Sequence, residues 1–219
     1  MSSNRAKDQL YQAIGRVAAV LGSAGRLQIL EFVAQGERSV DVLARMTGLS
    51  VANTSKHLQA LRQAGLVNAR KEGLRVFYSL AGDDVSLLLA ALRGVAEHRA
   101  AEVAGLVQAW LAHRDELEPV PARELLERAK SGLVTVLDVR PAEEYASGHL
   151  PGAISVPVER LEGYLSKLPK KREVVAYCRG PYCLMSFDAV VELRKRGFKA
   201  RRLENGFPEW RAAGLPVER

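Results

Sequence analysis

The segment REVVAYCRGPYC, residues 172–183, begins with an apolar run at 172–178 and contains the only two cysteines of the chain, Cys178 and Cys183. Such an uninterrupted run is typical of a strand buried on both faces, as strands of parallel sheets are. A helical apolar pattern begins at residue 184, directly after the second cysteine. The segment therefore predicts a strand, a short loop and a helix, with Cys178 at the end of the strand.

Two cysteines on one loop indicate sulfur chemistry, because scattered cysteines are more often small core residues. The helix N-terminus favours a thiolate, and we expect the backbone N–H groups that follow the strand to face Cys178. Cys183 could attack a persulfide at Cys178 and form a disulfide or a sulfur-bridged link. Equally, Cys183 could be a buried residue that never meets Cys178, because sequence spacing does not fix the distance between the sulfurs.

The residues around this segment repeat the same pattern. Another apolar run, TVLDV at 135–139, predicts a second buried strand. Helical stretches lie between and after the runs, at 121–131, 141–147, 158–167 and 184–196. This alternation predicts an α/β domain with a parallel sheet and helices on both faces.

The N-terminal half predicts a mostly helical domain. Helical periodicity over 5–35 is interrupted at Gly22 and Gly25, which separate two helices. Ser39 and Ser50 are placed to cap two further helices, 40–46 and 51–64, which together form a helix-turn-helix. A hairpin follows at 67–80, and then one long helix at 83–113. That long helix is apolar around so much of its circumference that we expect it to pack against a partner subunit.

Length and charge fit two domains and a nucleic-acid partner. We place the domains at 1–115 and 122–219, with a proline-containing linker at 116–121. The net charge is +7, and residues 38–75 hold seven basic residues against only Asp41 and Glu72. A local excess of this kind fits a small DNA-binding module. With no secretory signal or membrane-spanning run apparent, we expect a cytoplasmic protein with reactive rather than disulfide-bonded cysteines.

The stretch LSVANTSKHLQALRQAGLV, residues 49–67, resembles the recognition helix of ArsR-type winged-helix repressors, and the basic hairpin after it resembles their wing. The resemblance covers about residues 8–110 and implies a homodimer bound to double-stranded operator DNA. If Val51, Leu58 and Leu61 face the core, polar residues of the helix face outward. Asn53 and Gln59 can then read base edges, whereas Ser55, Lys56 and the wing tip suit phosphates. The remaining candidates for DNA contact are His57 and the tip residues Arg70, Lys71 and Arg75.

Metal sensing, which the same resemblance raises, is not expected here. The first helix of the helix-turn-helix lacks the cysteine pair that many relatives use. The last helix offers five possible ligands without convincing ligand spacing: Glu97, His98, Glu102, His113 and Glu116. We therefore expect no metal and no cofactor.

The stretches LDVRPAEEYASGHLPGAISVP (137–157) and ENGFPEWRAAGLPV (204–217) resemble the N- and C-terminal signatures of rhodanese domains. The resemblance covers about residues 118–219. It implies that Cys178 is a nucleophile that takes sulfane sulfur from thiosulfate, a polysulfide or a persulfide. Arg179, Gly180 and Tyr182 would form its loop, with Cys183 as a possible resolving thiol. Three further residues would support the loop: Asp138, Arg140 and His149.

The loop also departs from that family, because CRGPYCLMS (178–186) lacks a downstream basic residue. This puts efficient thiosulfate turnover in question, and the absence of Cys-x5-Arg argues against phosphatase or arsenate-reductase chemistry. Three functions remain open. The chain is a repressor whose rhodanese domain senses or relays reactive sulfur, a sulfurtransferase with an accessory DNA-binding domain, or a regulator with an inert rhodanese domain that serves as a partner module.

Overall fold

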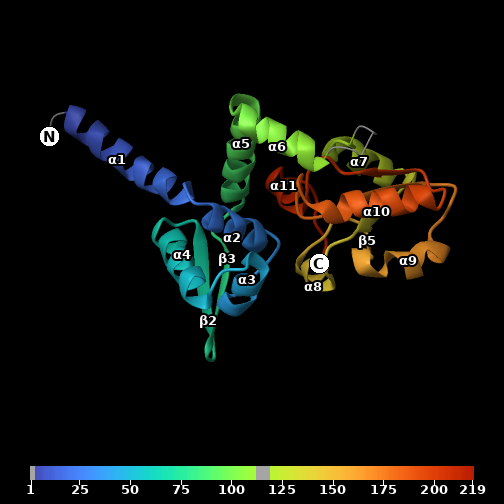
Figure 1. The fold of residues 1–219 in the computed structure, drawn as a ribbon, viewed down its shortest axis with the longest axis horizontal. Coiled ribbons are helices and arrows are strands. Elements are labelled where there is room, and N and C mark those ends of the chain that lie inside the picture. The colour runs from blue at the N-terminus through green and yellow to red at the C-terminus, as the bar shows by residue number, and fades with distance from the viewer. Residues whose placement is uncertain (1–2, 112–118) are drawn as a thin grey trace. The chain divides into compact units, whose positions relative to one another are not determined.

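The computed structural model describes residues 3–111 and 119–219 of the chain (Figure 1). It divides into two compact units, Met1–Val85 and Ser86–Arg219. The predicted boundary residue 115 and the first residues of the predicted linker at 116–121 lie outside the described residues, so those domain limits stay a prediction.

The first unit contains the predicted helix-turn-helix and hairpin. Its elements are α1 (Ser3–Leu21), α2 (Ala24–Ala34), β1 (Arg38–Ser39), α3 (Val40–Thr47), α4 (Val51–Gln63), β2 (Val67–Glu72) and β3 (Arg75–Leu80). Both predicted caps are present, because Ser39 Oγ accepts from Val42 N at 3.5 Å and Ser50 Oγ accepts from Asn53 N at 3.2 Å. The strands form an antiparallel sheet in the order β1-β3-β2.

One core prediction in this unit is wrong. Leu58 and Leu61 are fully buried, but Val51 is 50% exposed and Thr54 is buried in its place. Val51 is the first residue of α4, and Thr54, about one turn later, is the first buried residue of the helix. Thr54 tolerates burial because its hydroxyl donates to Ser50 O at 3.0 Å.

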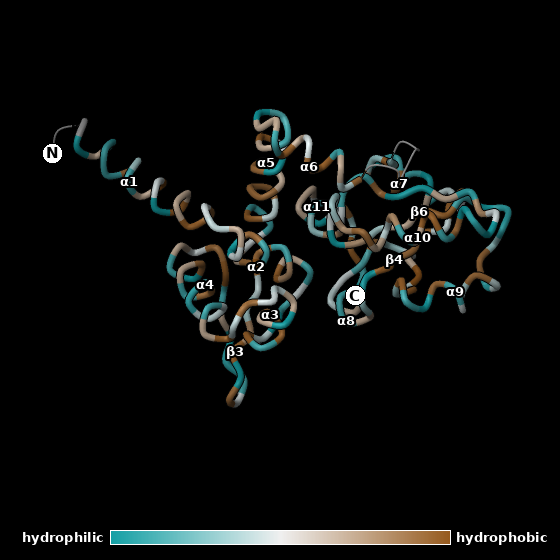
Figure 2. The backbone as a smooth tube through the Cα atoms, viewed as in Figure 1, coloured by the Kyte–Doolittle hydropathy of each residue, from teal (hydrophilic) through white to brown (hydrophobic). Residues whose placement is uncertain are grey.

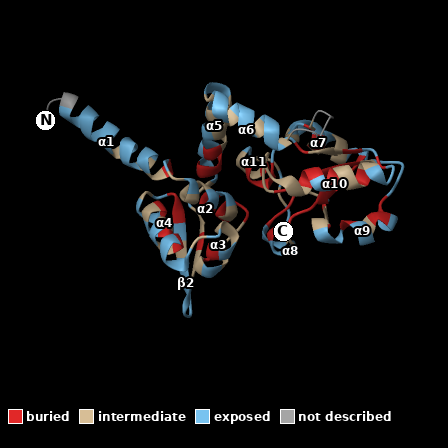
Figure 3. Ribbon diagram, viewed as in Figure 1, coloured by how far each residue is buried: buried red, intermediate tan, exposed pale blue. Residues whose placement is uncertain are grey.

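The predicted single helix at 83–113 is two helices, α5 (Asp83–Arg99) and α6 (Ala101–Leu111). No proline marks the break at Ala100, so the periodicity gives no sign of it. The predicted residues 112–113 lie outside the described residues. Both helices carry exposed large apolar residues, as α1 does; Figure 2 colours the backbone by hydropathy and Figure 3 by burial. These residues are Leu10, Tyr11, Ile14, Leu87, Leu88, Leu92, Val95, Leu106 and Trp110.

The second unit contains the predicted parallel sheet. Its four strands, β4 (Val134–Asp138), β5 (Ile154–Ser155), β6 (Glu173–Tyr177) and β7 (Ala200–Arg202), lie in the order β5-β4-β6-β7 and all pair in parallel. The remaining elements are α7 (Ala122–Lys130), α8 (Ala142–Ser147), α9 (Leu161–Tyr164) flanked by short 3-10 turns at Val158–Arg160 and Leu165–Lys167, α10 (Leu184–Lys195) and α11 (Phe207–Ala212). The fold class is therefore confirmed.

Helices cover both faces of this sheet. One core cluster joins the sheet to α9 and α10 and contains Val174, Ala176 and Cys178. The other joins it to α7 and α11 and contains Val175 and Tyr177. Because side chains alternate along a strand, this parity puts the Cys178 side chain on the face that α10 covers.

Among the described residues, no single helix is long and apolar enough to cross a membrane. The segments Arg5–Leu21 and Ala24–Ala34 pass that test of length and composition only as a pair, bent by 86°.

Candidate functional site

The cysteine loop lies where β6 meets α10. Cys178 follows the last residue of β6 and is only 2% exposed, whereas Cys183 is partly exposed and immediately precedes α10. A turn closes the loop, with Cys183 N donating to Gly180 O at 3.1 Å. The two cysteines therefore belong to one small loop, as predicted, although only one of them is accessible.

Hydrogen-bond acceptors surround the Cys178 sulfur. Its thiol donates toward Cys183 O at 3.4 Å and Ser186 Oγ at 3.3 Å, with Gly180 O at 3.9 Å. Burial and the neighbouring Cys183 sulfur raise the pKa of Cys178 well above 9.0, because both disfavour a charge there. The environment thus stabilises the protonated thiol.

Cys183 has the opposite environment. A hydrogen bond from the Cys178 thiol, the N–H groups of Arg179 and Met185, and the Arg179 guanidinium lower the pKa of Cys183 to about 7, although burial opposes them. Cys183 is the N-cap residue of α10, although its side chain makes no capping hydrogen bond. The expectation that the thiolate environment surrounds Cys178 is therefore wrong: the positive end of α10 lies at Cys183, five residues further on.

Arg179 is held in place by a carboxylate that the sequence analysis missed. Its Nε and Nη2 donate to Glu144 in α8 at 2.7–3.1 Å, and Glu144 is 1% exposed. The pair fixes the guanidinium near the cysteine loop, where it favours negative charge on sulfur. Glu144 lies inside the motif at 137–157, but a sequence pattern does not reveal that one of two adjacent glutamates is buried.

The C-terminal motif braces the same loop. Phe207 N donates to Cys178 O at 3.2 Å. A Cβ added at Gly206 would lie 2.4 Å from the backbone of Arg179 and Gly180, which no side chain tolerates. Gly206 is therefore required by the close approach of two backbone segments.

Two of the predicted supporting residues, Asp138 and Arg140, form a buried network with Tyr177, the residue before Cys178. Asp138 accepts from Arg140 Nη2 and Tyr177 Oη, both at 2.5 Å, and Arg140 Nη2 also donates to Gly148 O at 2.8 Å. Asp138 and Arg140 are fully buried. His149 stacks on Tyr145 with ring centroids 3.7 Å apart, and its Nδ1 lies 3.1 Å from Tyr145 O. Asp138 and Tyr177 therefore join the ends of β4 and β6, whereas His149 packs against α8; the supporting role of the three residues stays a prediction.

Tyr182 lies between Cys178 and Cys183 in the sequence. Its side chain makes a contact with α5, within the second unit, that the sequence did not suggest. Its hydroxyl donates to Glu97 of α5, and Arg93 of the same helix pairs with Glu209 of α11. Burial and the Glu97 carboxylate raise the pKa of Tyr182 to about 12. A cavity of about 320 Å³ lies beside these pairs, lined among others by Arg93, Glu97, Pro181, Tyr182 and Arg202.

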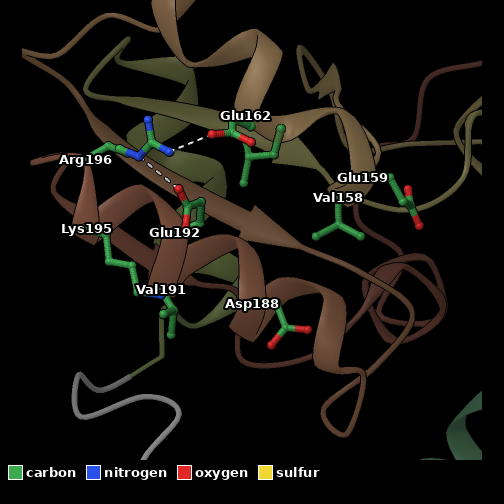
Figure 4. Close-up of a pocket in the computed structure, with 9 residues that line it drawn as sticks. Val158, Glu159, Glu162, Asp188, Val191, Glu192, Lys195 and Arg196 are labelled. Atoms are coloured by element: carbon green, nitrogen blue, oxygen red, sulfur yellow. Dashed lines mark hydrogen bonds and ion pairs between the residues drawn. The ribbon is translucent and has the colours of Figure 1, made fainter.

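A second depression, of about 500 Å³, lies between the α9 region and α10 (Figure 4). Arg196 crosses it and pairs with Glu162 at 2.7 Å and Glu192 at 3.0 Å. Neither cysteine lines this depression. We assign it no role.

The predicted DNA-reading face of α4 is mostly accessible. Asn53, Lys56 and Gln59 are exposed, and Ser55 is partly exposed. His57 differs, because its Nε2 would lie 3.2 Å from a Cβ added at Gly25 and it therefore packs toward the start of α2. Asn53, Lys56 and Gln59 are thus available to DNA, whereas His57 is partly enclosed.

The three basic residues predicted at the hairpin tip are exposed, but one of them is already ion-paired. Arg70, Lys71 and Arg75 are all exposed. Arg70, however, pairs with Glu37 at 2.6 Å and with Glu72 at 2.5 Å. Its charge is therefore already balanced locally, in contrast to the positive potential expected of a phosphate contact.

The residues considered as metal ligands are dispersed. Glu97 accepts from Tyr182, His98 Nδ1 lies 2.6 Å from Gly94 O, and Glu102 is exposed on α6. His113 and Glu116 lie outside the described residues. Within 3–111 and 119–219, no three such ligands form a group that could hold a metal ion.

Comparison with known proteins gives two family matches. Residues 23–69 match bacterial regulatory proteins of the arsR family, and residues 121–213 match the rhodanese-like domain. The HTH-type transcriptional regulator Rv0324 of Mycobacterium tuberculosis is 45% identical over 97% of this chain and 93% of its own length. A sulfurtransferase of Allochromatium vinosum is 33% identical over 38% of this chain and 78% of its own length.

Among solved structures, a homodimeric winged helix-turn-helix DNA-binding domain from Mycobacterium bovis, titled a possible ArsR-family regulator, is 42% identical. It covers 46% of this chain and 91% of its own, with a TM-score of 0.42.

A helix-turn-helix with a basic wing, followed by an α/β domain, is the architecture of a DNA-binding transcriptional regulator with an appended second domain. The chain belongs to the ArsR family of bacterial regulatory proteins, and its C-terminal domain is a rhodanese-like domain.

Proposed function

We propose that this chain is a repressor whose DNA binding depends on sulfane sulfur held as a persulfide at Cys178. The observation that supports this most is the paired environment of the two thiols. The Cys178 thiol donates toward the Cys183 backbone carbonyl at 3.4 Å, and the neighbouring Cys183 has a pKa lowered to about 7. A thiolate and a neighbouring thiol on one rigid loop are suited to accept a sulfur atom and retain it.

The loop has a direct connection to a helix that continues from the DNA-binding fold. Tyr182 lies between the cysteines and donates to Glu97, and a second ion pair joins Arg93 to Glu209. Helix α5 begins at Asp83, shortly after the wing strand β3 ends at Leu80. A change in the conformation of the loop would therefore reach α5 through Tyr182.

We further propose that the chain acts as a homodimer on operator DNA. The exposed apolar side chains of α5 and α6 fit a subunit interface, since they reach 63% exposure at Leu106. The similar domain from Mycobacterium bovis is titled homodimeric. The exposed residues of α4 and the wing tip would contact bases and phosphates in each half-site.

The second candidate function is a sulfurtransferase with an accessory DNA-binding domain. The intact Cys178 and the similarity to a protein named sulfurtransferase favour it. A substantial thiosulfate:cyanide rate that is lost in Cys178→Ser and indifferent to DNA would support this alternative. A regulator instead requires that sulfur loading changes DNA affinity.

The test uses the full chain and a fluorescein-labelled duplex that the reduced protein has selected from a random library. Treatment with sodium tetrasulfide should weaken binding at least about tenfold, and a dithiol should restore it. Cys178→Ser should bind the duplex normally but lose the response. Glu97→Ala should take up sulfur yet respond less, whereas the matched variant Glu102→Ala on α6 should respond like the wild type. Unchanged affinity in a wild-type protein that has gained sulfur would refute the proposal.

A further inference from the structure

The proposed function leaves open which sulfur atom reacts first, and the two thiols differ in access. Cys178 is 2% exposed and packs in the core cluster of α9 and α10. Cys183 is partly exposed at the start of α10. A donor arriving from solvent therefore meets Cys183 before Cys178.

The polar groups around the two cysteines also favour Cys183 as the first thiol to react. Cys178 is surrounded by acceptors, the carbonyls of Gly180 and Cys183 and the hydroxyl of Ser186, which suit an S–H donor. Cys183 precedes a twelve-residue helix, near the Arg179 guanidinium that Glu144 holds in position. A helix N-terminus and a fixed cation suit a thiolate and an incoming anionic polysulfide.

We propose that Cys183, not Cys178, is the thiol at which sulfane sulfur enters the site, and that Cys178 then takes the sulfur from it. This inference rests on the proposed function, since it assigns the order of steps within the same loop. The pKa of Cys183, lowered to about 7, agrees with that order.

The first step is a thiolate displacement. The Cys183 sulfur attacks the terminal sulfur of a polysulfide dianion, a new S–S bond forms, and the bond from that terminal sulfur to its neighbour breaks. The shortened polysulfide leaves with the electron pair, and Cys183 becomes a persulfide anion. Thiolate and donor together carry three negative charges, as do the two products.

In the second step the Cys178 sulfur attacks the outer sulfur of the Cys183 persulfide. The bond between that outer sulfur and Cys183 breaks, and the proton of the Cys178 thiol passes to the departing Cys183 sulfur. The Cys178 thiol lies beside Cys183, because it donates toward Cys183 O at 3.4 Å. One sulfane sulfur changes place, and neither cysteine undergoes net oxidation. The product is a buried Cys178 persulfide beside a Cys183 thiol.

The test follows sulfur site by site in the full chain. Trypsin cleaves after Arg179, so the Cys178 peptide (173–179) separates from the Cys183 peptide (180–194). The reduced protein is treated with sodium tetrasulfide near pH 7, quenched with an alkylating agent at intervals, and digested. Sulfur should appear first on the Cys183 peptide and later on the Cys178 peptide.

Variants separate the two steps. Cys178→Ser should load Cys183 at the wild-type rate and retain the sulfur there. Cys183→Ser, checked against Cys183→Ala and by thermal melting, should load Cys178 at least about sixfold more slowly near pH 7 and recover as the pH rises. Loading of Cys178 at the wild-type rate in both Cys183 variants would overturn the inference, as would failure of Cys178→Ser to load. Absence of sulfur from every protein, wild type included, would instead overturn the proposed function.

Discussion

Alkylation of the reduced chain by iodoacetamide should modify Cys183 before Cys178 at pH 7. The Cys178 thiol, the N–H groups of Arg179 and Met185 and the Arg179 guanidinium stabilise a Cys183 thiolate. Burial keeps the proton on Cys178. Because the thiolate is the reactive form, alkylation distinguishes these two environments without any sulfur donor.

The expected ratio follows from the pKa values. At pH 7 a thiol with a pKa of about 7 is half ionised, whereas a thiol left at 9.0 is about 1% ionised. This roughly 50-fold advantage shrinks about eightfold, because a weaker base is a weaker nucleophile. The remaining advantage is about sixfold, and it is a lower bound because Cys178 has a pKa above 9.0 and is buried.

The assay measures alkylation of the peptides 173–179 and 180–194 between pH 5 and pH 10. The Cys183 rate should rise through about pH 7 and level off above it. The Cys178 rate should still be rising at the alkaline end. Cys183→Ser is the control, and it should abolish the fast phase. Faster modification of Cys178, or one shared profile for both peptides, would refute the electrostatic assignment.

Three further predictions concern the support of the loop and the DNA-binding face. Asp138→Asn removes the carboxylate that pairs with the fully buried Arg140 and should cost about 3–5 kcal/mol, seen by calorimetry as a lower melting transition; the exposed Glu143→Gln should change it little. Gly206→Ala should displace the loop at Arg179, so that tryptic mapping shows slower sulfur uptake at both cysteines, and uptake at the wild-type rate would contradict the close approach. Lys71→Ala should weaken DNA binding and reduce the slope of log affinity against log salt by about one. Arg70→Ala should reduce that slope less, because Glu37 and Glu72 already neutralise Arg70.

Much of the fold could be predicted because its signals are local. Ser39 and Ser50 cap helices through their own hydroxyls, and the two buried strands are continuous apolar runs. The two-residue strands β1 and β5 are too short to show a period. The exposure of Val51 depends on where α4 begins relative to the core, and tertiary packing alone determines that position.

The site was predictable in outline only. The position of Cys178 at a strand end follows from the apolar run before it. Which cysteine sulfur lies at the N-terminus of α10 depends on the backbone conformation of the six loop residues 178–183. The sequence spacing of the two cysteines does not determine that conformation. Glu144 and Ser186 contact the loop from other elements, so their roles require the folded chain. The contact from Tyr182 to Glu97 joins residues 85 positions apart and has no local signal.

If sulfur on this loop controls DNA binding, passage over immobilised DNA should separate sulfur-loaded protein from unloaded protein. The full chain is loaded with a limiting amount of sodium tetrasulfide and passed over immobilised selected duplex. The protein mass in the bound and unbound fractions is then measured by intact mass spectrometry. The unbound fraction should be enriched in protein with one added sulfur atom, and the bound fraction should be mostly unmodified. Equal sulfur content in the two fractions would contradict control of DNA binding by sulfur.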